Sequence, residues 1–386
     1  MFLALRELAY ARGRFSLMGV VIALIAILMV MLSGLSAGLV NDGVSGLKGL
    51  PVSAVAFDAG TRQDNAFSRS VVDAEQLSAW QEHPDVAQAT PMGVSIVNAE
   101  TDSGAQVDLT LFGVEPDSFL APSLSAGSPL GDPAGIVVSE TMREEGVEIG
   151  TVLTLERVGT ELEVVGFTEG QATFGHVDVA WTPLATWQLI TLGEAPAAAP
   201  TAEDLAALEA DHASVIALQG VPGSPLAAGD PAALADGDAA ADTTTMTLEQ
   251  SFNASPGYQA ETLTLSMIQW FLYAIGALVV GAFFTVWTIQ RGHELAVLRA
   301  MGASARYLLR DGLAQAAVLL VAFTAVGVAV GVGLGALMPA GMPFSLEARP
   351  IAVASALTVL LGLIGAAVAV LRVTRIEPVT ALGGAR

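Results

Sequence analysis

The chain has 386 residues, 53% of them hydrophobic, and a mean hydropathy of +0.60, a composition that excludes an ordinary soluble protein and a disordered one. Its net charge of −22 argues against nucleic-acid binding, which needs a basic surface. The absence of cysteine excludes disulfides and thiolate metal sites. The single lysine, Lys48, stands outside any Gly-x-x-x-x-Gly-Lys-Ser/Thr phosphate loop, so ATP would have to bind another chain.

Four segments without Asp, Glu, Lys or Arg are predicted to cross a membrane as helices. They are 15–40, 264–290, 313–339 and 350–371. At about 1.5 Å per residue, each one reaches across the ~30 Å hydrocarbon core. The alternative for the first is a cleaved signal peptide, whose apolar region is usually only about 7–15 residues long. The alternative for the others, a buried helix of a soluble protein, is disfavoured by their length.

The charges divide the chain in the same way as the hydropathy. Residues 41–263 contain 33 acidic and 5 basic residues, whereas the rest contains 5 acidic and 11 basic ones. Ten arginines lie in the tracts 1–14, 291–312 and 372–386, against one in the loop 340–349. The positive-inside rule therefore places both termini and the 291–312 loop in the cytoplasm, residues 41–263 outside, and the chain in the plasma membrane.

Residues 41–263 are predicted to form a mixed α/β domain inserted between the first two spans. β-favouring runs predict strands at 52–57, 106–112, 135–138, 152–157, 162–167 and 177–181. Helices are expected at 139–145 and 201–212, the second beginning with a capping box of Thr201 and Asp204. The segment 221–242 is rich in Gly, Ala, Pro and Asp, which predicts a flexible insertion or linker.

The loop between the second and third spans has the most specific pattern. Leu295, Leu298 and Met301 recur at helical spacing, which predicts a short amphipathic helix over 294–304 with Gly302 as its C-cap. Such a helix either lies on the membrane surface or docks into a soluble partner.

The sequence of this loop, ELAVLRAMGA at 294–303, resembles the E-I-x-x-L-R-A-x-G-A signature of FtsX/MacB-type ABC transporter permeases. RIEPVTAL at 375–382 resembles the closing R-x-x-P-x-x-A-L of that family, and GIVVSE at 135–140 resembles part of its extracytoplasmic domain. The stretches 14–39 and 256–271 most resemble the haem-exporter (HrtB/DevC-like) permeases within that family.

The resemblance implies a type VII ABC transporter, in which two permease copies work with two cytoplasmic ATPase chains that hold Mg-ATP. The chain itself is then not an enzyme, and haem is its expected substrate, taken from the membrane lipids and not bound permanently. The alternatives are lipid or lipoprotein extraction, and mechanical activation of an extracellular cell-wall hydrolase. The expected ATPase-coupling residues are Glu294, Leu295, Leu298, Arg299, Met301 and Gly302.

Without cysteine, the iron of haem would need Met, His, Tyr or carboxylate ligands, and no permanent metal site is expected. Of the four histidines, His83, His176 and His212 lie in the predicted outer domain. Polar residues within a span usually face a bundle interior or a cavity. The candidate haem residues are Met29, Ser33 and Ser36 on one face of the first span, Tyr258 and Glu261 before the second span, and Glu209 and His212 in the predicted 201–212 helix.

Each candidate also has a structural explanation. Met29 could instead fill a helix interface, and the polar residues could be solvated. Two small-residue stripes leave a similar choice, because either could pack within one protomer or between the two copies of a homodimer. The stripes are Gly34 and Gly38 in the first span, and Gly327, Gly331 and Gly335 in the third. We expect haem at the dimer interface, near the outer ends of the first two spans.

Overall fold

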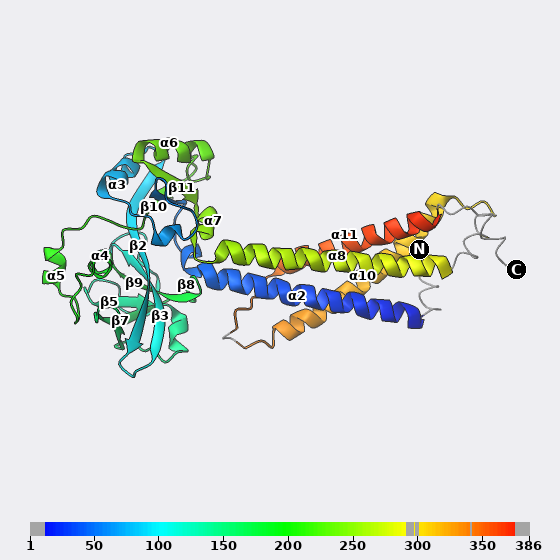
Figure 1. The fold of residues 1–386 in the computed structure, drawn as a ribbon, viewed down its shortest axis with the longest axis horizontal. Coiled ribbons are helices and arrows are strands. Elements are labelled where there is room, and N and C mark those ends of the chain that lie inside the picture. Colours follow the sequence, from blue (N-terminus) through cyan, green and yellow to red (C-terminus); the bar gives the residue numbers. More distant parts are fainter. Residues whose placement is uncertain (1–11, 291–296, 298–300, 340–341, 375–386) are drawn as a thin grey trace. The chain divides into compact units, whose positions relative to one another are not determined.

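The structure is a computed structural model, and it describes residues 12–290, 297, 301–339 and 342–374. The chain divides into two compact units, one formed by Met1–Leu39 with Thr262–Arg386 and the other by Val40–Glu261. Four helices in the described residues are long and apolar enough to cross a membrane. A mixed α/β domain is inserted between the first and the second of them (Figure 1), so the predicted fold class is confirmed.

The membrane helices are α2 (Arg12–Lys48), α8 (Tyr258–Gln290), α10 (Ala305–Gly335) and α11 (Ala348–Thr374). The helices do not share the ends of the predicted spans. Helix α2 continues past residue 40, α8 begins before 264, and α10 begins at 305 and ends at 335 instead of 313 and 339. Ser304 starts α10 because its hydroxyl accepts a hydrogen bond from the backbone N–H of Tyr307. The first turns of α10 contain Arg306, Arg310 and Asp311. A search for segments without charged residues therefore cannot find where this helix begins.

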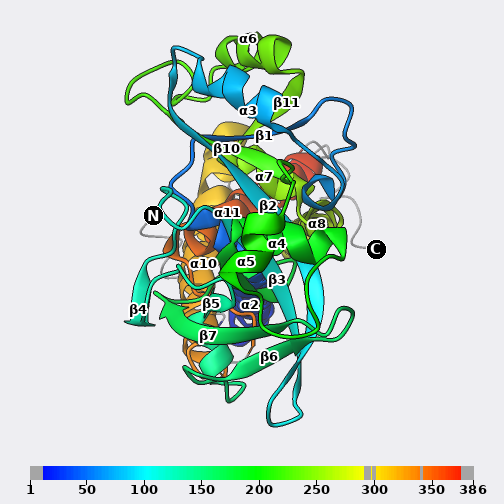
Figure 2. The same ribbon diagram turned by 90° about the vertical axis from the view of Figure 1, so that its left-hand side faces the viewer.

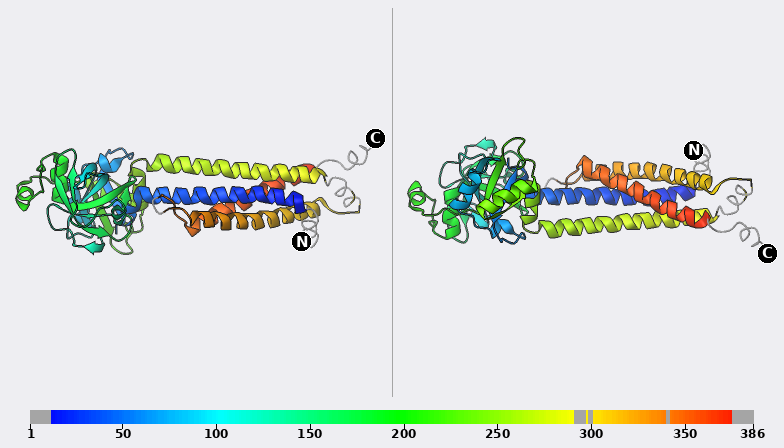
Figure 3. Two further views of the ribbon diagram at one scale, coloured as in Figure 1. Left: turned by 90° about the horizontal axis from the view of Figure 1, so that it is seen from below. Right: turned by 90° about the horizontal axis from the view of Figure 1, so that it is seen from above.

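Glycines let the membrane helices, which run alongside one another in Figure 3, pack closely within one chain. A Cβ built on Gly327 of α10 would lie 2.4 Å from the backbone oxygen of Ala23 in α2. One on Gly365 of α11 would lie 2.4 Å from the backbone oxygen of Ala277 in α8. The stripe on the first span also packs internally, because a Cβ on Gly34 would meet the ring of Phe344 at 2.3 Å.

The remaining glycines of the stripes make similar contacts. They are Gly38, which lies against Pro343, Gly331 against Val30, and Gly335 against Phe344 and Leu346. Both stripes therefore pack inside the protomer, which decides between the two alternatives that the sequence left open.

The outer domain contains an eleven-stranded sheet. Its strands are β1 (Ala54–Asp58), β2 (Val86–Thr101), β3 (Gln106–Val114), β4 (Leu124–Gly127), β5 (Gly135–Val138), β6 (Val152–Leu155), β7 (Glu161–Thr168), β8 (Thr173–Phe174), β9 (Val177–Pro183), β10 (Val215–Gly220) and β11 (Thr243–Thr247). Their order is β11-β1-β10-β2-β3-β9-β5-β7-β4, β8 pairs with β9, and β6 pairs with both β2 and β7. Strands β2, β3, β9, β5, β7 and β6 thus close into a ring, which leaves these strands fewer free edges.

Alternate residues of the strands fill two hydrophobic cores. In β3, Leu109 and Leu111 belong to one core and Phe112 to the other, as the two-residue period of a strand requires. Helices α3 (Ala74–Gln81) and α6 (Pro231–Ala241) lie together at one end of the domain (Figure 2), where Trp80 packs over Gly237. Helix α4 (Leu184–Leu192) places Trp187 over Gly93 of β2 and Gly113 of β3.

Three predictions for the outer domain were wrong. The 201–212 helix has its capping box, but α5 (Ala202–Ala207) ends early, because Leu208 adopts an extended backbone that leads toward β10. The 221–242 segment is no flexible linker: Asp230 caps α6 with Pro231 in its first turn, and Leu226 and Leu234 are buried in a core. The expected 139–145 helix is a short 3₁₀ turn, Glu140–Arg143.

The sequence analysis also missed two helices and several strands of this domain, α3, α4, β2, β4, β8, β10 and β11. The short α7 (Leu248–Ser251), which follows β11, was missed as well.

Replacing Gly327 by Leu should destabilise the bundle, because the backbone of α2 cannot yield to the new side chain. We expect a loss of about 1–3 kcal/mol, typical of an overpacked core, measured as a lower midpoint of thermal unfolding in detergent. Gly333→Leu is the matched control in the same helix, since a Cβ there meets nothing within 4 Å. Equal midpoints for the two variants would contradict this packing.

Candidate functional site

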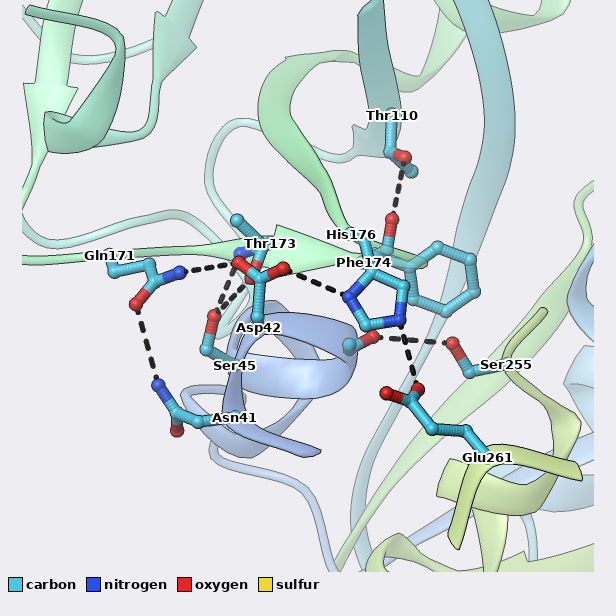
Figure 4. A network of polar contacts seen from close by, with 11 residues as sticks. Asn41, Asp42, Ser45, Thr110, Gln171, Thr173, Phe174, His176, Ser255 and Glu261 are labelled. Carbon is cyan, nitrogen blue, oxygen red and sulfur yellow. Dashed lines mark hydrogen bonds and ion pairs between the residues drawn. The ribbon is translucent and has the colours of Figure 1, made fainter. Parts of the chain in front are cut away.

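The polar site of greatest interest lies in the outer unit, where the end of α2 and the first turn of α8 meet the turn between β8 and β9 (Figure 4). Phe174 pairs with Val177, so Gly175 and His176 form a two-residue hairpin turn. Both have positive φ, +61° and +66°, as in a type I′ turn. Glycine would be favoured at the second position, so a histidine there has a conformational cost.

The ring of His176 lies between two carboxylates that come from different helices. Its Nδ1 is 2.9 Å from Oδ2 of Asp42 in α2, and its Nε2 is 3.1 Å from Oε2 of Glu261 in α8 (Figure 4). The three side chains are partly exposed, at 36% for His176, 25% for Asp42 and 22% for Glu261. We call Asp42, His176 and Glu261 the histidine junction.

Only the doubly protonated imidazolium can donate hydrogen bonds from both ring nitrogens. Partial burial by itself lowers the pKa of His176. The hydrogen bonds to Asp42 and Glu261 and the charges of these carboxylates outweigh the burial, so the pKa lies above its ordinary value of 6.5. The geometry therefore favours the charged ring.

A break in α2 supports the junction. Val44 has non-helical angles, φ −145° and ψ 15°, and the preceding carbonyl of Gly43 accepts hydrogen bonds from outside the helix. The donors are the N–H of Gly175, at 2.8 Å, and the hydroxyl of Ser255 just before α8, at 3.3 Å. One backbone oxygen thus joins the end of α2, the hairpin turn and the approach to α8.

Further polar contacts fix the end of α2 on the hairpin. The hydroxyl of Ser45 accepts a hydrogen bond from the N–H of Thr173 at 2.8 Å and lies 2.7 Å from that residue's hydroxyl. Gln171 donates from Nε2 to Oδ1 of Asp42 at 2.9 Å, so both oxygens of that carboxylate are engaged. This arrangement holds segments of the chain together and contains no nucleophile aligned with a base, so we infer a mechanical role for it.

Asp178, in β9, is a half-buried acid near the junction. Burial raises its pKa, against the hydrogen bonds from Thr141 and Ser139, and the charge of Asp42 raises it further. Burial raises the pKa of Glu145 as well, followed by the charges of Asp178 and Asp108. In the described part of the chain no group of three or more His, Cys, Asp or Glu side chains is arranged to hold a metal ion.

The structure separates the predicted haem residues. On α2, Met29 is 2% exposed and Ser33 is 6% exposed, so both are covered within one chain, whereas Ser36 is half-buried. Tyr258 lies in the first turn of α8 with Glu261, and its ring packs edge-on against Phe252.

Glu209 and His212 lie apart from the junction. Glu209 is exposed and follows the end of α5, whereas the ring of His212 packs against Trp187 of α4, with centroids 5.6 Å apart. Helix α5 stands at the end of the outer domain far from the start of α8 (Figures 1 and 3). These two residues therefore cannot share a site with Glu261 within one chain.

Most of the predicted coupling residues, Glu294, Leu295, Leu298 and Arg299, lie outside the described residues. Met301 is 71% exposed, and Gly302 has a φ of +98°, a backbone that favours glycine. An exposed methionine beside this turn is available to a partner.

Neither of two cavities contains a predicted haem residue. One, between the membrane helices, has a volume of about 10 Å³ and is lined mainly by apolar residues such as Ile22, Tyr273 and Leu320. This is room for about one water molecule and not for a porphyrin. A groove of about 570 Å³ lies between β2 and the end of α4, lined by residues that include Ile96, Arg157 and Leu192.

Sequence reasoning noted His176 as an outer histidine but did not select it. A signal was present, because Gly-His between two short β-favouring runs predicts a hairpin turn with the histidine exposed at its tip. Its partners, Asp42 and Glu261, are 134 and 85 residues away, and no local pattern links them.

Comparisons with known proteins find matches in both units of the chain. A family model described as the FtsX-like permease C-terminal region matches residues 266–378, and one described as the MacB-like periplasmic core domain matches residues 15–219. A protein of Staphylococcus haemolyticus named as a hemin transport system permease, HrtB, is 23% identical over 388 residues, covering 100% of this chain and 99% of that protein. An HrtB protein of Staphylococcus epidermidis is 32% identical over 127 residues, 33% of this chain and 36% of that protein.

Two solved structures resemble about half of the chain. The periplasmic region of MacB from Actinobacillus actinomycetemcomitans has a TM-score of 0.36 and 11% identity, covering 52% of this chain and 91% of that one. The extracellular domain of the noncanonic ABC-type transporter YknZ from Gram-positive bacteria has a TM-score of 0.34 and 12% identity, covering 51% and 98%.

We expect an NMR titration of the histidine-labelled full chain to give His176 a pKa above 6.5. Replacing Glu261 by Gln should lower this pKa, because a neutral amide attracts the imidazolium less strongly than a carboxylate does. The signal is assigned by its loss in His176→Asn, and His212 serves as the internal reference. A His176 pKa at or below 6.5, unmoved by the substitution, would refute the charged junction.

Proposed function

Because the chain belongs to the FtsX/MacB-type permeases of ABC transporters, we propose that it is the membrane subunit of an ATP-driven pump that exports haem, or another flat hydrophobic molecule. The observation that carries the proposal is the alignment, over the full length of the chain, with a protein named for hemin transport. A cargo dissolved in the membrane also suits this chain, whose α8 exposes Trp270 at 60% and Phe271 at 64%.

Energy comes from a separate ATPase in this proposal. The only lysine is not in a phosphate loop, so the chain supplies helices and a partner supplies ATP hydrolysis. The partner docks on the 291–312 loop, where Met301 is exposed, and two permease copies form the membrane part of the pump.

We place the haem between the two copies, on the face of α2 that contains Met29, Ser33 and Ser36. Met29 is covered in the single chain, so it becomes an axial ligand only when the helices around it separate during the transport cycle. Because the cargo enters sideways from the lipid, it does not need to pass the acidic outer domain.

Haem added to the purified permease–ATPase complex should give a saturable absorbance change. Met29→Ala should shift the Soret band or weaken binding by about tenfold, because a thioether ligand is lost. Met18→Ala is the matched control, since Met18 is a second buried methionine of the same helix, 4% exposed and three turns away. Equal effects of the two changes would remove Met29 from the site, and no saturable binding by the wild type would favour the lipid or hydrolase alternatives.

The isolated chain should show no ATPase activity, whereas the complex should hydrolyse ATP. Gly302→Val should reduce hydrolysis by the complex at least about tenfold without preventing membrane insertion, because φ of +98° disfavours a branched side chain. Gly13→Val, at a site with nothing within 4 Å of a Cβ, controls for the added bulk. Hydrolysis by the purified chain alone would contradict this division of labour.

Single cysteines in this cysteine-free chain can test the proposed orientation, with both termini in the cytoplasm. Ala232→Cys lies on the exposed surface of α6 in the outer domain and should react with a membrane-impermeant maleimide in intact cells. Ala303→Cys, in the loop before α10, should react only after the membrane is opened. The reverse pattern would invert the topology.

A further inference from the structure

We propose that His176 is a positioning residue whose proton determines how firmly the end of α2 and the first turn of α8 are held together, and that this hold slows the ATP-driven cycle. The role in the cycle rests on the proposed function. The proton-dependent contact does not rest on the proposed function. It follows from the distances of 2.9 Å and 3.1 Å that separate the ring of His176 from Asp42 and Glu261 within this chain.

The two protonation states of the ring have opposite effects on the junction. The imidazolium donates to both carboxylates, and each bond joins opposite charges. A neutral ring donates from one nitrogen only and turns a lone pair of the other toward a carboxylate oxygen. Asp42 and Glu261 then also lose the cation between them, so their mutual repulsion favours separation of the helix ends.

The sign of the pH dependence follows from the direction of the shift. A group whose folded pKa is raised stabilises the fold fully at a pH below its unfolded value, about 6.5. That stabilisation is lost as the pH rises through the raised pKa of His176. The junction is therefore closed in mildly acidic surroundings and loosened in alkaline ones.

Other charged groups near the junction do not reproduce this pattern. Lys48 reaches the junction through Asn41, whose amide oxygen lies 3.4 Å from Nζ of the lysine. Asp178 also has a raised pKa, but a carboxyl group ordinarily titrates in acid, well below the range of an imidazole. Glu249, in α7, is a carboxyl group close enough to interact electrostatically with Tyr258 beside the junction. Among these described groups around the ring, His176 is the imidazole, the side chain that ordinarily changes charge near neutral pH.

The position of the histidine junction allows it to affect movements of the membrane helices. Helices α2 and α8 are the two membrane helices that continue into the outer domain, so a movement of one past the other must strain or break the junction. Two-state contacts of this kind set the balance between conformations of a transporter.

The first test is thermal unfolding of the full chain in detergent, as wild type and as His176→Asn. Asparagine tolerates the left-handed backbone of position 176, so the substitution changes the charge without changing the turn. The wild type should unfold several degrees higher at about pH 6, and the two midpoints should converge at about pH 9. His212→Asn, which removes a ring that packs against Trp187 and lies 3.4 Å from the hydroxyl of Thr191, should not reproduce this convergence. A difference that stays constant with pH would overturn the proton dependence.

The second test uses ATP hydrolysis by the complex reconstituted with its ATPase, without haem. The ratio of the His176→Asn rate to the wild-type rate should be about two- to fivefold at pH 6 and should fall to one at pH 9, as expected for a partly exposed ion pair. His176→Lys, which keeps a cation at both pH values, should remain slow at pH 9. Parallel pH profiles for wild type and His176→Asn would overturn the role in the cycle.

The two tests separate this proposal from the proposed function. If no ATPase is stimulated by the chain, the pump assignment fails while the unfolding test still decides the junction. If the complex hydrolyses ATP and binds haem but unfolding shows no pH-dependent difference, the junction proposal fails alone.

Discussion

The outer domain must begin and end at the same place, because it is inserted between two membrane helices and the chain has to return to the membrane. A single hairpin turn meets this constraint. The carbonyl of Gly43 accepts from Gly175 and Ser255, and the ring of His176 lies between Asp42 and Glu261. The break at Val44 exposes the carbonyl that makes this possible. The histidine has a left-handed backbone that costs about 1–2 kcal/mol and that two charge-assisted hydrogen bonds offset.

The rest of the domain makes this turn a firm support. Strand β9, which leaves the turn, lies between β3 and β5 in the closed ring, and Thr110 of β3 donates to the carbonyl of Phe174 just before the turn. A ring packed with buried leucine and valine side chains does not deform gradually under load. Strain that reaches the turn is therefore concentrated in the weak, partly exposed junction, and this is where a proton has the greatest effect.

The membrane unit relies on a different interaction. Lipid tails are as apolar as leucine, so its helices gain little from burial and associate through close contacts at glycine. Gly327 and Gly365 bring backbones together within the chain, and α8 is left with large exposed apolar side chains such as Leu278. That face suits lipid, a second copy of the chain or a hydrophobic cargo, in agreement with the proposed export of haem.

The sequence by itself determined the class of the protein, because hydrocarbon is a uniform solvent that selects long apolar segments wherever they occur. It also determined most strands with clear β-favouring runs, and the family to which the loop at 294–303 belongs. It could not reveal β2, because Pro91 and Gly93 interrupt the strand pattern. Nor could it reveal α6, which is only weakly amphipathic and packs against Trp80 through Gly237.

Only the tertiary structure decided which polar residues work together. Glu209 and His212 were candidate haem residues together with Glu261 but lie apart from it, whereas His176 gained its role from partners 134 and 85 residues away. The sequence likewise left open whether the glycine stripes pack within one protomer or between two. The contacts between the helices answered this question. Composition and periodicity indicate whether a segment is surrounded by water, by lipid or by a protein core. The pKa of a histidine depends instead on the charges that folding brings within about 3 Å of its ring.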